Sequence, residues 1–110
     1  MNWLKKLYIT PAMKKKKTKI IWKLDHGAGV TGVYLLLIPY TKANQLEIMN
    51  AAYLKQRFLR KQNMTVVGMA ESYEQAVLLL QQIVEEVYTK TGTANIRSFF
   101  DINRKESETK

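Results

Sequence analysis

The sequence predicts an α/β fold, with α+β as the alternative, built as a two- or three-layer sandwich around a small mixed β-sheet. Three observations predict it. The chain has 110 residues, which is the size of one domain, and 46% of them are hydrophobic. Short apolar runs typical of strands alternate with two longer segments of helical period. Glycine and proline together make up only seven residues, so the composition is that of a folded chain.

The first 17 residues are expected to form a basic arm, either flexible or folded as a short helix. Its apolar residues have the i, i+3/i+4 spacing of one helix face, and Pro11 would limit that helix. The run Lys14–Lys17 carries four like charges and should be solvated. We assign residues 18–102 to a single α/β domain and residues 103–110 to a polar C-terminal tail.

Two strands joined by a loop are predicted next. In Thr18–Leu24, alternate residues, among them Ile20 and Trp22, would point to one face. Asp25–Gly32 is a glycine-rich connection, and Val33–Pro39 is a continuous apolar run of the kind buried on both faces of a sheet.

The segment Asn44–Lys61 predicts the first helix, with its first residue or Thr41 as the N-cap. Beside its main apolar arc, it carries a second stripe formed by Leu46, Met49 and Tyr53. A helix that is apolar on two sides is buried on two sides, so this stripe is a candidate interface with a second copy. Coverage by the N-terminal arm or the C-terminal strand is the alternative.

The second half of the chain predicts a strand, a helix and a last strand. Thr65–Ala70 is short and β-branched, and Ser72 with a glutamine three residues later is a capping box that opens a helix over 73–88. Gly92 is a plausible stop, and Ala94–Phe100 is a candidate final strand. The core stripe expected on this helix is Ala76, Leu80, Ile83, Val84 and Val87.

The predicted order is therefore β-β-α-β-α with a candidate final β. The strand Val33–Pro39, the first helix and the strand Thr65–Ala70 should form a right-handed parallel crossover. The residues expected in the core are Trp22, Leu36, Ile38, Val66, Leu80, Ile83 and Val84.

Charge is distributed unevenly along the chain. Residues 1–23 contain eight lysines and no acid, whereas residues 24–110 have a net charge of only +1. Such asymmetry indicates contact with an anionic partner. The candidate anion-binding residues are Lys5, Lys6, Lys14, Lys15, Lys16 and Lys17. A secondary basic patch comprises Lys55, Arg57, Arg60 and Lys61.

The stretch Gly27–Gly32 satisfies the pattern G-x-G-x-x-G, but a strand rather than a helix follows it. Because phosphate binding needs the N-terminus of a helix there, we interpret these glycines as loop residues with positive φ. Asp25 and His26 are neighbours, and an enzyme reading requires them to form a pocket with this loop and residues from elsewhere.

Composition excludes several other classes of site. Without cysteine the chain has no disulfide, thiolate nucleophile or cysteine-based zinc site, and its single histidine and scattered acids predict neither a metal nor another cofactor. No apolar run reaches the ~18 residues of a transmembrane segment. We expect a cytoplasmic protein.

The function that the sequence favours is a non-enzymatic binding module whose basic arm contacts an anionic partner, with nucleic acid preferred over an anionic membrane surface. The alternative is a small protein-interaction or structural domain, homo-oligomeric, whose basic tail is incidental.

Overall fold

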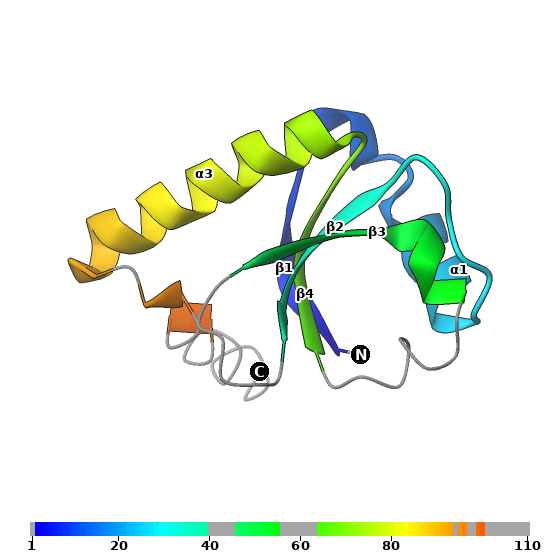
Figure 1. Ribbon diagram of the computed structural model, residues 1–110, viewed down its shortest axis with the longest axis horizontal. Helices are drawn as coiled ribbons and strands as arrows, with labels where there is room; N and C mark the ends of the chain where they lie inside the picture. Colours follow the sequence, from blue (N-terminus) through cyan, green and yellow to red (C-terminus); the bar gives the residue numbers. More distant parts are fainter. Residues whose placement is uncertain (1, 40–45, 56–63, 94, 97–98, 101–110) are drawn as a thin grey trace.

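The computed structural model describes residues 2–39, 46–55, 64–93, 95–96 and 99–100 (Figure 1). Two candidate caps, Thr41 and Asn44, and the expected C-terminal tail lie outside the described residues. The helices and strands, in chain order, are β1 (Asn2–Ile9), the 3-10 helix η1 (Pro11–Met13), α1 (Lys17–Asp25), β2 (Tyr34–Pro39), β3 (Glu47–Asn50), the 3-10 helix η2 (Ala51–Lys55), β4 (Met64–Ala70) and α3 (Tyr73–Thr91).

The strands form one mixed sheet in the order β1-β4-β2-β3. β1 runs parallel to β4, whereas β2 is antiparallel to both β3 and β4. The small mixed sheet is confirmed, and with two helices packed on it the fold belongs to the α+β class. The parallel crossover predicted between residues 33–39 and 65–70 is wrong, because those strands are antiparallel neighbours. The one parallel pair joins β4 to the N-terminal strand instead.

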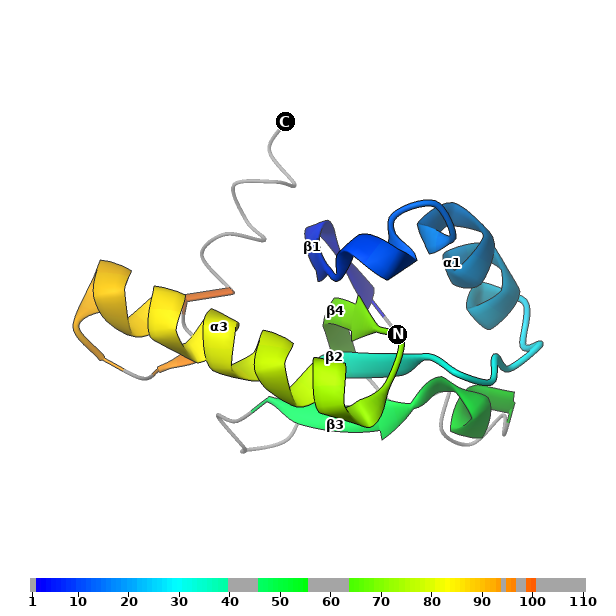
Figure 2. The same ribbon diagram turned by 90° about the horizontal axis from the view of Figure 1, so that it is seen from above.

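Two apolar clusters cover the two faces of the sheet, and α3 and α1 lie on opposite sides of it (Figures 1 and 2). The central strand β2 serves both clusters. Leu36 and Ile38 pack toward α3, and Leu35 and Leu37 pack toward α1, with all four side chains buried. Burial on both faces is the reason that this strand reads as a continuous apolar run, as the sequence predicted.

A bulge in β4 adjusts which side chains face each cluster. Leu36 pairs with Gly68, whereas Leu37 pairs with Val66, so one extra residue is accommodated in β4. A Cβ at Gly68 would lie 2.8 Å from the backbone oxygen of Tyr8. Only glycine therefore allows β1 to approach β4 this closely.

The helix α3 is defined by its caps, as predicted. The Ser72 hydroxyl accepts a hydrogen bond from the backbone N–H of Gln75 at 3.1 Å. Gly92 adopts the left-handed conformation, and its N–H bonds to the carbonyl of Tyr88 at 2.8 Å. The buried stripe contains Leu79 where Leu80 was expected, and Leu80 is partly buried beside it.

The elements predicted near the two ends of the chain are wrong. Residues 2–9 form an edge strand of the sheet, where the sequence predicted a separate arm, flexible or helical, and Leu4 is buried under α3. Residues 18–24 belong to the helix α1 rather than to a strand. At the C-terminus, Ile96, Phe99 and Phe100 are helical where a strand was predicted.

The predicted helix over residues 44–61 is wrong as well in its described part. Glu47–Asn50 is an edge strand that pairs with β2, and it places Ile48 toward one cluster and Met49 toward the other. As a strand, this segment forms backbone hydrogen bonds with β2 and packs its side chains against both apolar clusters. These tertiary interactions outweigh its helical propensity.

Among the predicted core residues, Leu36, Ile38, Val66 and Ile83 are buried, while Leu80 and Val84 are partly buried and pack against the core. Trp22 is the error. Its side chain is 61% exposed, because α1 is a helix and turns this residue away from the sheet.

Candidate nucleic-acid interface

The helix α1 and the turn before it carry the largest concentration of positive charge in the described residues. Residues 14–26 contain six lysines and one aspartate, a net charge of +5. The side chains of Lys14, Lys15, Lys16 and Lys19 are exposed, and those of Lys17 and Lys23 are half-buried. We call this surface, formed by these six lysines, the basic face.

The lysines at the start of α1 destabilise this helix. The N-cap residue Lys16 makes no side-chain capping hydrogen bond, and the first turn contains no acid. The positive end of a helix dipole disfavours cations there, whereas Lys23 in the last turn is favourably placed. The stability of α1 therefore does not account for the lysine run.

The basic face is held in place by the apolar side of the same helix. Ile20 and Leu24, one turn apart, are buried against η2 and the sheet, in a cluster that includes Met13 and Leu54. Because the inner side is anchored in the core, the outer side presents its charges on a rigid support.

An exposed aromatic pair lies within the basic face. The indole of Trp22 stacks on the imidazole of His26, with ring centroids 4.1 Å apart and planes inclined by 22°. The Nδ1 atom of His26 lies 2.7 Å from the carbonyl oxygen of Trp22. A carbonyl can only accept, so this hydrogen bond places a proton on Nδ1 and fixes the imidazole beneath the indole.

The end of α1 is joined to the edge strand β1. The Trp3 indole N–H donates to the Asp25 carboxylate at 2.9 Å. Asp25 and His26 thus have different partners, and the structure does not bring their side chains together as an acid–base pair. The glycines of the following loop, Gly27, Gly29 and Gly32, all have positive φ, which confirms their interpretation as loop residues.

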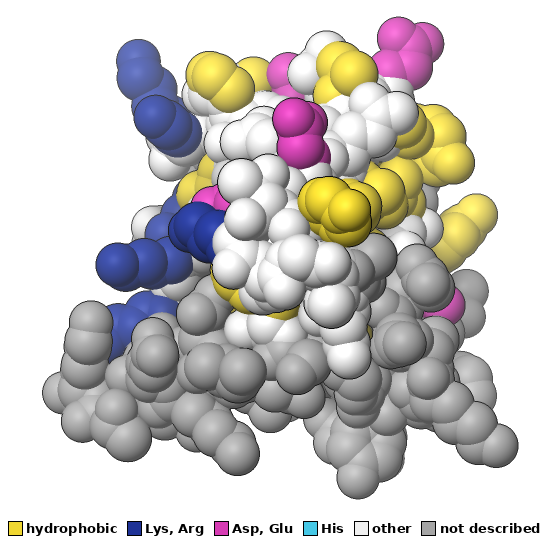
Figure 3. All heavy atoms as spheres, turned by 90° about the vertical axis from the view of Figure 1, so that its left-hand side faces the viewer, with side chains coloured by type: hydrophobic (Ala, Val, Ile, Leu, Met, Phe, Trp, Pro, Cys, Tyr) yellow, Lys and Arg dark blue, Asp and Glu magenta, His cyan; other side chains and the backbone are white. Residues whose placement is uncertain are grey.

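The remaining sequence-predicted residues lie elsewhere. Lys5 and Lys6 are exposed on β1, within the part of that strand where the register with β4 shifts. Lys55 is exposed at the end of η2, and the other members of its patch, Arg57, Arg60 and Lys61, lie outside the described residues. Seen from the C-terminal end of α3, lysines gather along one edge of the molecule and hydrophobic side chains along the opposite edge (Figure 3).

The candidate interface stripe is not assembled. Leu46 is buried in the cluster under α3, Met49 packs against the opposite cluster, and Tyr53 is exposed. The stripe depended on a helix that the strand β3 replaces, so these side chains point in different directions.

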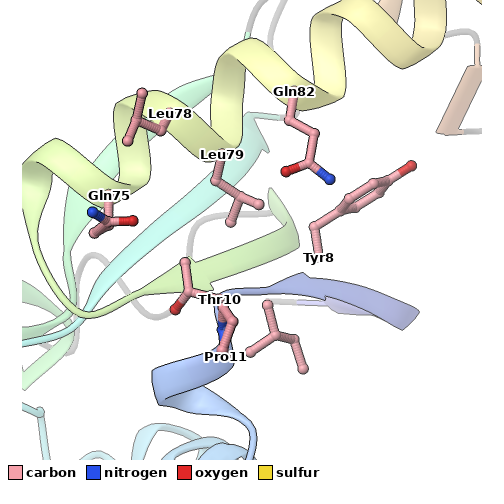
Figure 4. Close-up of a pocket in the computed structure, with 8 residues that line it drawn as sticks. Tyr8, Thr10, Pro11, Gln75, Leu78, Leu79 and Gln82 are labelled. Carbon is pink, nitrogen blue, oxygen red and sulfur yellow. The ribbon is translucent and has the colours of Figure 1, made fainter.

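A separate pocket of about 260 Å³ lies between α3 and the end of β1 (Figure 4). Its wall on α3 includes the amides of Gln75 and Gln82, and its wall on the β1 side includes Tyr8 and Thr10. The Thr10 hydroxyl is buried and has no hydrogen-bond partner in the part of the chain that the structure describes.

Tyr8 is held at the rim of this pocket by a strong hydrogen bond to Glu86, with the oxygens 2.5 Å apart. Burial raises the pKa of the Tyr8 phenol above its ordinary value, and the Glu86 carboxylate raises it further. A phenol is protonated near neutral pH even at its ordinary pKa, and the raised pKa of Tyr8 extends this to higher pH, so Tyr8 is the donor in its bond to Glu86.

The Trp22–His26 pair was missed as part of the site because a strand at residues 18–24 would have buried the indole. The signal is nevertheless in the sequence: Lys19, Trp22 and His26 have i, i+3 and i+7 spacing and share one side of a helix.

Comparison with known proteins gives no match to a family model, to a curated protein or to a solved structure. In the described residues, no cluster of three or more histidine or acidic side chains could hold a metal ion. Within the same residues, no helix combines the length and the apolar character needed to cross a bilayer.

Proposed function

We propose that the protein binds nucleic acid through the basic face of α1, with no enzymatic step. The observation that supports this proposal is the placement of uncapped lysines at the start of an anchored helix, where they cost stability. Residues that oppose the local fold are most simply explained by an interaction outside it.

Phosphate is the ligand that such a surface fits. A nucleic-acid backbone presents a row of evenly spaced negative charges, and lysines bind it as point charges with gain from counterion release. Lysine contacts to phosphate read no base edges, so we expect binding that tolerates changes of sequence.

A gel-shift titration at about 50 and about 200 mM salt tests the proposal. Six lysines set a limit near −5 on the slope of log K against log salt for duplex DNA, and we expect a slope of about −2 to −4. Replacing Lys14, Lys15, Lys16 and Lys17 with glutamine should remove most of that slope and leave the fold intact.

Two matched double variants distinguish the effect of lysines on the basic face from the effect of net charge alone. Lys14→Gln with Lys15→Gln, and Lys5→Gln with Lys6→Gln, change the total charge equally, but only the first pair lies on the basic face. We expect the first pair to weaken binding more. Equal effects would contradict the assignment to α1, and no binding by the wild type at low salt would overturn the proposal.

Two exposed tyrosines on α3, with two partly buried side chains between them, favour a second candidate function, self-association. Tyr73, Leu80, Val84 and Tyr88 follow one another at helical spacing, and the two tyrosines are 57% and 61% exposed. We call these four residues the α3 stripe. Only the tyrosines of this stripe are exposed, and exposed apolar side chains that gather on one side of a helix are a feature of protein-interaction surfaces.

A further inference from the structure

We propose that the strand bound by the basic face is single, and that Trp22 holds it by stacking against an unpaired base. This inference rests on the proposed function and narrows it to one class of nucleic acid. It is carried by the one aromatic side chain in the described residues that lies on the basic face and is also highly exposed.

The geometry of Trp22 is that of a stacking platform. One face of the indole rests on the His26 imidazole, which is itself fixed by its hydrogen bond to the helix backbone. With 61% of the residue exposed, the other face is open to solvent. A base placed there would continue a parallel stack, and the indole would lose little freedom on binding because it is already oriented.

The lysines around the indole suit a backbone that passes over it. Lys19 lies one helical turn before Trp22 on the same side of α1, and its side chain is exposed. Proteins that bind single strands combine such cations, which track the phosphates, with aromatic rings that hold the bases.

Duplex DNA cannot use this platform. Its bases already stack on one another, and their faces become available only when a base is flipped out at a cost of a few kcal/mol. Lysine contacts to phosphates, in contrast, need no unpaired base and can be made with either form. We therefore expect replacement of Trp22 to lower the affinity only for nucleic acid that has unpaired bases.

Fluorescence anisotropy with three labelled probes of about 15 nucleotides tests this point: oligothymidine, an abasic strand of the same length, and a duplex. The abasic strand retains the phosphates and lacks the bases. We expect Trp22→Ala to bind oligothymidine about 5- to 100-fold more weakly, since stacking contributes strongly for each base. Binding to the abasic strand and to the duplex should change less than about 2-fold.

Two variants serve as controls. Trp22→Phe keeps an aromatic ring and should restore most of the affinity for oligothymidine. Leu78→Ala removes a large apolar side chain, 56% exposed, from α3, away from the basic face and outside the α3 stripe, and should have no effect. Because Trp22 is exposed, the variants should keep the wild-type circular dichroism spectrum.

The outcomes distinguish this inference from the proposed function. If Trp22→Ala weakens all three probes equally or none of them, stacking is overturned, while loss of binding in the lysine variants would still support the basic face. If the wild type binds no probe but binds vesicles containing phosphatidylserine, both the stacking inference and the nucleic-acid function are overturned.

Discussion

Tyr8 and Glu86 are 78 residues apart in the sequence, yet their hydrogen bond joins the edge strand β1 to α3. The bond from Tyr8 lowers the pKa of the Glu86 carboxyl, with a further contribution from Lys90 at 3.1 Å, although partial burial opposes the shift. The Tyr8 ring also meets Phe100 edge to face, with centroids 5.9 Å apart. One side chain thus connects three segments of the chain.

The pH dependence of stability should reveal this bond. Because folding lowers the pKa of Glu86 from its ordinary value near 4.5, the stabilisation is complete above that value and is lost as the pH falls through the lowered pKa. Tyr8→Phe keeps the ring contact and removes the donor. We expect it to cost about 1 kcal/mol at pH 7 and less at about pH 3, measured by urea unfolding.

Tyr34→Phe is the matched control, since the Tyr34 ring also makes an edge-to-face contact, with Tyr73. Its effect should not depend on pH. A Tyr8→Phe effect that is equal at both pH values would show that the charge on Glu86 does not contribute.

At the scale of the element, the two long helices illustrate what the sequence can and cannot predict. α3 has a capping serine, a sustained helical period and a terminal glycine, and these local signals agree with the observed helix. Its buried stripe contains Leu79, which was not expected, while the expected Leu80 and Val84 are only partly buried. In α1 the local signals are weak, because its start has neither a cap nor an acid.

An ambiguity of spacing explains the error at α1. Ile20 and Leu24 are four residues apart, and this separation places them on one face of a strand as well as on one face of a helix. Ile96 and Phe100 repeat the same ambiguity at the C-terminus, and both pairs are buried on helical backbone. Only the surrounding contacts distinguish the alternatives, so the lysines could be recognised directly in the sequence, whereas the spacing of Trp22 and His26 has meaning only once the segment is known to be a helix.

Because the lysines at its start destabilise α1, replacing one of them with an acid should stabilise this helix. Lys17→Glu replaces a cation with an anion in the first turn, where the helix dipole favours negative charge. We expect the free energy of unfolding to rise by about 0.3–1 kcal/mol and the affinity for oligothymidine to fall.

Thermal unfolding and anisotropy measured on the same preparation check both parts of this expectation, and Lys17→Gln should give intermediate values. A variant that is less stable than the wild type would show that Lys17 supports the fold, which would remove the main argument for the basic face.

At the scale of the whole molecule, the charged and apolar surfaces are segregated. The basic face lies on α1, whereas the α3 stripe lies on the helix at the other side of the sheet. If both proposed surfaces function, binding of a polyanion and association with a second copy should not compete, because the two surfaces lie on opposite sides of the sheet.

Sedimentation analysis tests self-association through the α3 stripe. If it occurs there, the wild type should show a concentration-dependent increase in mass, and replacing Tyr73 and Tyr88 with serine should abolish it without loss of fold. Replacing Lys14 and Lys15 with glutamine should leave the mass unchanged. A wild type that stays monomeric at high concentration would exclude this second function.

The parallel pairing of β1 with β4 has a consequence for how the chain is made. Trp3 lies opposite Val66, so the ribosome delivers the first strand long before the strand that it must join. Until then the apolar side chains of β1 have no finished surface on which to pack, and closing so large a loop is slow. The pairing of β1 can form only after β4 has emerged, and β1 must stay unpaired until that moment. We expect the exposed Lys5 and Lys6 to limit wrong pairing in this interval, because charged residues on an edge strand discourage pairing with a neighbouring chain.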